Sequence, residues 1–230
     1  MKKYLALLFF VLCGLTVING QTINEFQVSL AVPQGDYADD DEDDAIFDGS
    51  GVAATGFYLG YKAITPISNE NLFWTFNAGI MYNGLQSDFT DELEDMLDEE
   101  EGDLEKMAKY LNVPLMAGLQ YETSLSDGMS LFGEAGLGVN ILKITNMSAS
   151  YYDGEFSTKF QPSVGLGYKI GGGIVIQDKY TISLNYLSLG SHKVKYKNIV
   201  EYDGEKETDS DKFNKALPIT SLNITLGIRF

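Results

Sequence analysis

The chain has 230 residues, enough for one good-sized domain or two small ones. It carries 33 acidic and 16 basic side chains, and its formal net charge is −17 at pH 7. This balance argues against a nucleic-acid partner, because phosphate binding needs clustered lysine and arginine. The 24 glycines, 14 tyrosines and 13 phenylalanines, against 5 prolines, favour β-structure with close backbone contacts.

The N-terminal segment has the layout of a secretory signal peptide. Lys2 and Lys3 precede an apolar run from Leu5 to Val17, which is too short for a membrane-spanning helix. We expect cleavage after Gly20, so that residues 1–20 are the signal peptide and 21–230 are the mature domain.

The single cysteine, Cys13, lies inside this apolar run. A lipoprotein anchor is the alternative interpretation, but Leu12 stands where such signals have a small residue. On the signal-peptide interpretation the mature chain has no cysteine, and it leaves the cytoplasm without relying on disulfide bonds.

Segments in which apolar and polar residues alternate follow one another along the mature chain. A period of two is the period of a β-strand. The segments are 25–33, 51–64, 72–82, 110–122, 130–144, 159–176, 180–189 and 221–230. No stretch of the mature chain approaches the roughly 20 apolar residues that a spanning helix needs.

The two faces of these segments differ in character. One face is apolar and has aromatic residues near segment ends, namely Trp74, Tyr82, Tyr121, Phe160, Tyr180 and Phe230. The other face is rich in glycine, serine, threonine and asparagine, as a crowded interior would be. A soluble barrel also alternates, with its apolar face inside. Aromatic girdles mark a membrane interface, so we predict that the apolar face contacts lipid.

The connections alternate between short and long. The short ones are 65–71, 124–128 and 177–179, whereas 33–50, 84–108 and 200–215 are long and acidic and 145–155 is intermediate. This is the layout of a transmembrane barrel, and an even strand number allows closure. We therefore predict an all-β fold, an eight-stranded antiparallel up-and-down transmembrane β-barrel with long acidic extracellular loops and both termini periplasmic.

Four stretches, AVPQGDYA, YLNVPLMAG, FGEAGLGV and the terminal SLNITLGIRF, together resemble the outer-membrane β-barrel domain family of Gram-negative bacteria, in its PorT-like branch. The resemblance covers essentially all of 21–230 and implies an outer-membrane location without catalytic residues. The last strand resembles the insertion signal read by the barrel-assembly machinery, through Leu222, Ile224, Leu226, Ile228 and Phe230. Implied partners are that machinery, outer-membrane lipids and lipopolysaccharide.

Four charged residues share the polar, inward face: Lys62, Glu134, Lys169 and Arg229. Strand directions place all four in the periplasmic half of the barrel. An eight-stranded barrel has room inside for side chains alone, and buried charges must be paired. We predict an ion-pair network that fills the lumen; a gated proton or ion path is the alternative.

An acidic run in the first long connection offers oxygen ligands of the kind that Ca²⁺ prefers. Its members are Asp39, Asp40, Asp41, Glu42, Asp43 and Asp44. Asp44 stands where the EF-hand pattern requires glycine, so a solvated loop is the simpler interpretation. Loose divalent-cation bridging to lipopolysaccharide phosphates is the alternative, and we assign no metal and no cofactor.

The segment 88–110 has apolar residues at helical spacing: Phe89, Leu93, Met96, Leu97, Leu104 and Met107. We predict a helix capped by Thr90 and stopped or broken at Gly102. It would lie over the outer mouth of the barrel, or bind a partner outside the cell.

The single histidine, His192, is the one candidate for a general base. Ser191 is next to it, but adjacent residues on a strand face opposite ways. We therefore expect His192 to be an interface residue at the outer rim, and we assign no catalytic residue.

We hypothesise a non-enzymatic, surface-exposed structural or interaction module. The alternatives are a small porin or channel, a secretion accessory protein, a barrel enzyme acting on lipids, and a soluble secreted ligand-binding barrel. Strand number argues against the porin, because water-filled channels come with about 16 strands. The extracellular partner and the oligomeric state are not specified by any motif.

Overall fold

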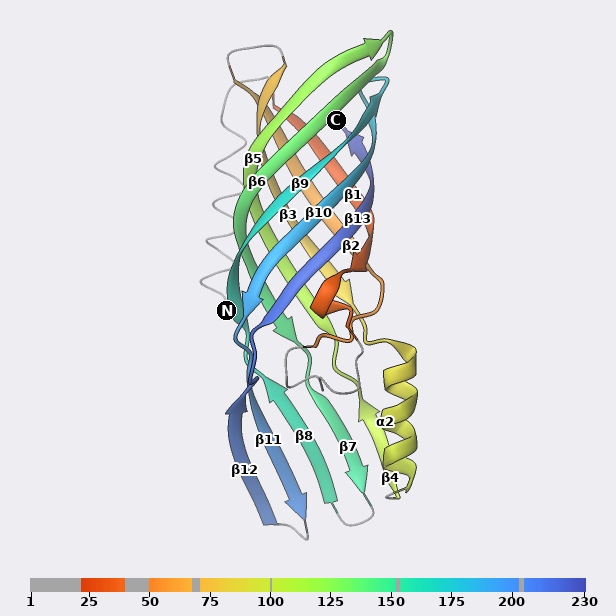
Figure 1. Ribbon diagram of the computed structural model, residues 1–230, viewed down its shortest axis with the longest axis vertical. Coiled ribbons are helices and arrows are strands. Elements are labelled where there is room, and N and C mark those ends of the chain that lie inside the picture. The colour runs from red at the N-terminus through yellow and green to blue at the C-terminus, as the bar shows by residue number, and fades with distance from the viewer. Residues whose placement is uncertain (1–21, 40–49, 68–70, 100, 152–153, 203–204) are drawn as a thin grey trace.

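The computed structural model describes residues 22–39, 50–67, 71–99, 101–151, 154–202 and 205–230. Strands close into an antiparallel barrel in the order β1-β13-β10-β9-β6-β5-β3-β2 (Figure 1). Their bounds are β1 Ile23–Pro33, β2 Gly56–Pro66, β3 Leu72–Asn83, β5 Tyr110–Ser126, β6 Met129–Ile144, β9 Ser163–Ile176, β10 Tyr180–His192 and β13 Leu217–Arg229. The predicted eight-stranded barrel is therefore confirmed.

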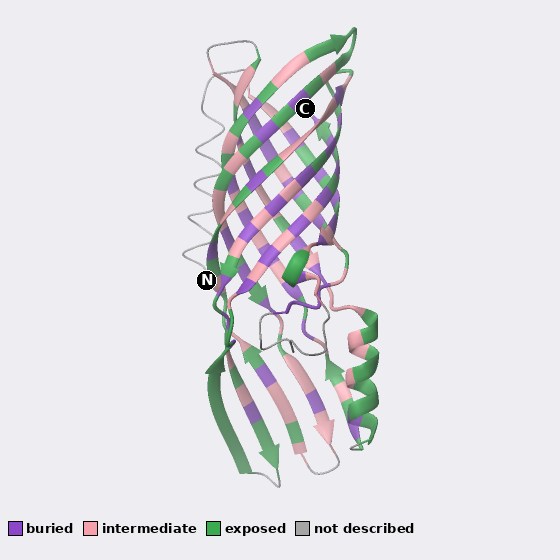
Figure 2. Ribbon diagram, viewed as in Figure 1, coloured by how far each residue is buried: buried purple, intermediate pink, exposed green. Residues whose placement is uncertain are grey.

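Burial alternates along the barrel strands, with exposed apolar residues on the outer surface (Figure 2). Leu137 and Leu166 are 72% and 81% exposed, while the inward-facing Asn112 and Asn140 are fully buried. This is the reverse of a water-soluble barrel, whose apolar face lines the interior. It is the distribution that lipid around the barrel requires.

The barrel closes where β1 pairs with β13, from Glu25 opposite Arg229 to Pro33 opposite Ser221. The seam continues one residue further, because Asn24 and Phe230 exchange two backbone hydrogen bonds of 3.2 and 2.9 Å. No open edge is left between the first and last barrel strands.

The connections at the end where β13 finishes are tight. Gln177 and Asp178, between β9 and β10, both have positive φ, 52° and 55°. That combination is typical of the two-residue type I′ turn, whose twist matches the flanking strands. Gly128 takes φ 75° in the turn between β5 and β6, where a side chain would be strained.

A second sheet stands on the opposite end of the barrel (Figure 1), with the order β12-β11-β8-β7-β4. Its strands are β4 Gly102–Lys106, β7 Met147–Tyr151, β8 Gly154–Phe160, β11 Lys195–Tyr202 and β12 Glu205–Lys212. Much of 145–155 and 200–215, expected as loops, is therefore strand. The segment 159–176, expected as one strand, is divided between β8 and β9.

The helix α2, Ser87–Glu99, begins before the predicted cap at Thr90. Thr90 does not cap it, because it lies within the first turn and donates its hydroxyl to Gln86 O at 2.9 Å. The helix ends before Gly102. Its last turn is acidic and lies at the negative end of the helix dipole, which is an unfavourable arrangement. Leu104 leaves the helix because β4 pairs with β7, where it lies opposite Ala149.

A short 3-10 helix, η1 Gly35–Tyr37, follows β1 and turns Tyr37 into the molecule. The acidic residues 40–44 and the signal peptide 1–20 lie outside the described residues. Asp39 is described, and its backbone carbonyl accepts hydrogen bonds from Val52 N and the Ser50 hydroxyl. Among the described helices, none has the length and hydropathy to cross a membrane.

Removing Phe230 tests the seam. The deletion removes both backbone bonds to Asn24 together with a ring that is 72% exposed on the outer surface. We expect less protein in the outer-membrane fraction and a smaller share of the fast-migrating, unboiled form on a gel. Deleting exposed Lys215, outside the seam, is the control. Equal assembly of the two variants would contradict the prediction.

Candidate functional site

The inward side chains of the barrel form three levels of different chemistry. Ionised groups lie near the tight-turn end, amides and hydroxyls lie in the middle, and apolar residues lie at the end that carries the second sheet. Each level follows from the residues on the inward face of the strands, since every second side chain points into the lumen.

Glu134 on β6 holds two lysines, one from the neighbouring strand β9 and one from β2 across the barrel. Its Oε2 lies 2.7 Å from Lys62 Nζ on β2, and its Oε1 lies 2.6 Å from Lys169 Nζ on β9. Lys62 Nζ also lies 4.9 Å from the centre of the Phe132 ring. The three side chains are at most 7% exposed. The cluster therefore ties opposite walls of the barrel across the lumen.

Arg229 does not join this cluster directly. Its Nε lies 3.1 Å from Glu25 Oε2 on β1, and its Nη2 lies 3.0 Å from Glu122 Oε2 on β5. Gln27 donates to the other oxygen of Glu25 at 2.6 Å. Sequence reasoning missed Glu25 and Glu122, although both lie two residues from inward glutamines and could have been found by alternation.

The two clusters balance each other. Glu134 with Lys62 and Lys169 leaves one positive charge, and Arg229 with Glu25 and Glu122 leaves one negative charge. Glu25 lies directly opposite Lys62 in the β1–β2 pairing. Because a buried charge is costly without a counter-charge, the six groups together form a neutral assembly that the interior can accept.

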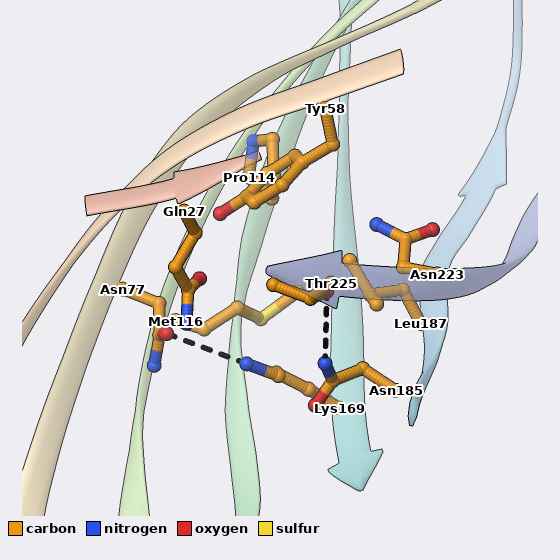
Figure 3. A pocket seen from close by; sticks show the side chains of 10 residues that line it. All are labelled: Gln27, Tyr58, Asn77, Pro114, Met116, Lys169, Asn185, Leu187, Asn223 and Thr225. Carbon is orange, nitrogen blue, oxygen red and sulfur yellow. Dashed lines mark hydrogen bonds between the residues drawn. The ribbon is translucent and has the colours of Figure 1, made fainter. Parts of the chain in front are cut away.

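The middle level is closed by side chains (Figure 3). A cavity of about 10 Å³ remains between Gln27, Tyr58, Asn77, Lys169 and Thr225, with five further side chains around it. That volume holds about one water molecule. Lys169 donates to Asn77 Oδ1 at 3.4 Å across it. The cavity is therefore far too small for a continuous water column at this depth.

The outer level is a hydrophobic core. Tyr37 from η1 enters the barrel mouth and meets Tyr110 of β5 edge to face, with ring centres 5.2 Å apart. Tyr37 donates to Asn83 Oδ1 at 3.2 Å, and Tyr110 donates to Gly51 O at 2.7 Å. Burial, and then the neighbouring Tyr110, raise the pKa of Tyr37 well above its usual value. Both phenols are thus neutral donors that fasten the first long connection over the mouth.

His192 lies inside the barrel, not at an interface on the outer rim as expected. A β-bulge between Ser188 and Ser191, with Gly190 at φ 91°, shifts the alternation of β10 by one residue. Leu189 and His192 therefore both face inward, and Ser191 faces outward. Gly190 was the sequence signal that could have indicated the bulge.

The histidine has a serine partner that sequence reasoning did not pair with it. Ser163 of β9 places its Oγ 2.7 Å from His192 Nδ1, and His192 Nε2 lies 3.1 Å from Leu189 O. A neutral ring can bond to the Ser163 hydroxyl in either tautomer, and its Nε2 also lies 3.2 Å from Asn140 Nδ2. A Cβ on Gly165 would come within 2.9 Å of Nε2, so the ring is closely packed. We interpret His192 as a satisfied interior residue.

Comparison with known proteins agrees with this architecture. A family model described as outer membrane protein beta-barrel domain matches residues 5–230. The crystal structure of a major outer membrane protein from Thermus thermophilus is similar, with 11% identity, a TM-score of 0.52, and 92% of this chain and 100% of that chain covered. At such identity the likeness shows the fold alone. No curated protein sequence matches the chain.

Two further solved structures are similar at lower scores. Neisserial surface protein A has 12% identity and a TM-score of 0.41, with 91% of this chain and 96% of that chain covered. OprG from Pseudomonas aeruginosa has 14% identity and a TM-score of 0.39, with 91% and 94% covered.

Replacing Glu134 by glutamine tests the inner ionic level. The change leaves Lys62 and Lys169 buried without their counter-charge, and breaking a buried pair in this way costs about 3–5 kcal/mol. We expect a clearly lower unfolding temperature in detergent, followed by the gel shift between folded and boiled forms.

Two further variants complete this test. Glu201→Gln removes a carboxylate from an exposed pair with Lys206 and should cost less than about 1 kcal/mol. The triple variant K62M/E134L/K169M should recover only part of the loss: it removes the whole triad, but it leaves the Arg229, Glu25 and Glu122 cluster with one uncompensated negative charge. Equal unfolding temperatures of the E134Q and E201Q proteins would contradict a stabilising role for Glu134.

Proposed function

The chain belongs to the outer membrane protein β-barrel family, and on this premise we propose that it is a non-enzymatic structural or interaction module exposed at the cell surface. The filled lumen carries this proposal. Ion pairs, amides and an apolar mouth succeed one another along the barrel axis, and the central cavity measures about 10 Å³. A barrel with a filled lumen serves as an anchor for the segments that project beyond the lipid, and such segments commonly carry recognition.

The proposed orientation places both ends of the mature chain in the periplasm and the second sheet outside the cell. Short turns at one end and long connections at the other support it, because transmembrane barrels have short periplasmic turns and longer extracellular connections. β1 begins and β13 ends at the tight-turn end (Figure 1).

The second sheet is the part best suited to recognition. It projects beyond the barrel (Figure 1), and its tip exposes Val200 and Tyr202 by 45% and 59%. Exposed apolar side chains grouped outside the lipid-facing surface are typical of interaction surfaces. The proposed module therefore presents a paired, ordered sheet, which holds its side chains in fixed positions better than a free loop would.

Assembly and anchoring supply the remaining proposed partners. Leu222, Ile224, Leu226 and Ile228 all face outward on β13, and the last three are among the exposed large apolar residues. Together with Phe230 they would present the barrel-assembly machinery with an apolar strand face and then contact lipid. Outer-membrane lipids and lipopolysaccharide would surround the finished barrel.

Conductance distinguishes this proposal from a small porin. The purified barrel in a planar bilayer should give no stepwise current above the lipid baseline, because side chains fill its lumen. A porin of about 16 strands, reconstituted in the same lipid, is the positive control. Discrete openings that scale with the amount of protein would contradict the filled-lumen interpretation.

Cysteine labelling on intact cells tests the orientation. If the signal peptide is cleaved, the mature chain has no cysteine, so a single Ser210→Cys on β12 and a single Lys179→Cys in a tight turn are clean probes. With a bulky maleimide that cannot cross the outer membrane, we expect a gel shift for S210C alone. K179C should react only after the membrane is permeabilised. The reverse pattern would overturn the orientation.

A further inference from the structure

Charge is sorted by face on β12, the last strand of the second sheet. β12 reads EKETDSDK, and alternation places Glu205, Glu207, Asp209 and Asp211 on one face and Lys206 and Lys212 on the other. Asp211 and Asp209 lie opposite Tyr196 and Asn198 of β11. Partial burial, and then these two carboxylates, raise the pKa of Tyr196. The acidic side of β12 therefore lies on the same face as Tyr196, although every residue of β12 is exposed.

Four lysines gather on the outward face at the base of this sheet. Lys195 of β11 lies directly opposite Lys212 of β12, and Lys197 lies directly opposite Lys159 of β8. Directly opposed side chains have Cβ atoms about 4.5–5.5 Å apart, and residues two apart on a strand are about 6.6 Å apart. The four ammonium groups can therefore converge on one small anion. We call them the lysine patch.

The lysine patch stands on a rigid support. Phe160 of β8, Tyr196 of β11 and Phe213, which directly follows β12, pack together on the opposite side from the lysines, with ring centres 5.9 to 6.3 Å apart. Phe213 also donates its backbone N–H to Val194 O at 2.9 Å. The backbone that carries the lysines is thus positioned by the apolar core that continues from the barrel mouth.

These four lysines form no ion pair within the part of the chain that the structure describes. None of them lies within 4.0 Å of a described carboxylate, whereas Lys206 at the sheet tip pairs with Glu201 at 3.1 Å. Like charges directly opposite on a sheet are destabilising. The chain has a net charge of −17, yet two such lysine pairs lie side by side, and an external anion would offset the repulsion between them.

The patch lies just beyond the apolar belt of the barrel. Val164 and Leu166 on β9 are 67% and 81% exposed, and Lys159 precedes Val164 by five residues, on the side of the second sheet. Tyr168 and Tyr186, with rings 6.2 Å apart, mark the outer surface of β9 and β10 below it. Lysine stems reach toward a membrane interface with their charges in the headgroup layer.

We propose that Lys159, Lys195, Lys197 and Lys212 form a binding site for the phosphate groups of an outer-leaflet glycolipid. Ammonium groups bind phosphate oxygens through short charge-assisted hydrogen bonds. The anion neutralises the opposed lysines, and the acyl chains of the same lipid contact Val164 and Leu166. The site rests on the proposed extracellular position of the sheet, which the cysteine labelling tests separately.

Calorimetric titration of the full-length barrel in a neutral detergent tests the site. The probes are purified lipopolysaccharide, the same lipopolysaccharide with its phosphates removed, and inorganic phosphate. We expect the phosphorylated lipid to bind in a salt-sensitive way, and K159Q/K195Q/K197Q/K212Q to bind it about tenfold more weakly or worse. The dephosphorylated lipid and inorganic phosphate should bind the unaltered protein much more weakly.

Matched variants separate the site from net charge and from folding. K106Q/K143Q/K179Q/K206Q makes the same change in net charge at exposed lysines outside the patch and should bind as the unaltered protein does. The all-arginine version of the patch should keep the affinity, and every variant must retain the heat-dependent gel shift. Equal loss in the two glutamine variants would overturn the site. Equal affinity for inorganic phosphate would overturn its assignment to a lipid.

Discussion

The structure depends on one constraint: a backbone N–H or C=O cannot face lipid without a hydrogen-bond partner. A sheet satisfies that constraint when it closes on itself, and here β1 and β13 supply the seam from Asn24–Phe230 to Pro33–Ser221. Closure then fixes which side of each strand meets lipid and which side must fit inside a narrow barrel.

Crowding inside the barrel explains the composition of the inward face. Tyr58 lies across Gly60 and Gly79, where a Cβ on either glycine would overlap its ring. The narrow interior also limits which ionised residues can be buried, because a dry environment accepts charged groups only when their charges cancel. Lys62, Glu134 and Lys169 need Arg229, Glu25 and Glu122 to reach that balance. A lumen filled in this way serves as a support, and recognition is left to the residues outside the lipid.

Antiparallel strand pairing continues outside the lipid, where water and not lipid surrounds the strands. The chain leaves the barrel as five further strands, and β12 remains exposed along its whole length. Water solvates both faces there, and on β12 the carboxylates share the face of Tyr196 while the lysines lie on the other face. The rigid base at Phe160, Tyr196 and Phe213 turns that sorting into fixed geometry, which is the basis for the proposed lipid-phosphate site.

The sequence by itself determined the barrel, its strand order along the chain and the face that meets lipid, because a period of two with small polar residues on one side is a local signal. It also indicated that Lys62, Glu134, Lys169 and Arg229 face inward.

The sequence could not specify which of these charged groups contact one another. Glu25 reaches Arg229 across the seam from the other end of the chain, and the bulge at Gly190 alone turns His192 toward Ser163. The second sheet could not be predicted for a related reason. β12 is a strand because β11 pairs with it, and EKETDSDK contains no apolar pattern that would predict this pairing. Local periodicity decides the orientation of a side chain, whereas contacts between distant strands depend on register, and register is a property of the closed barrel.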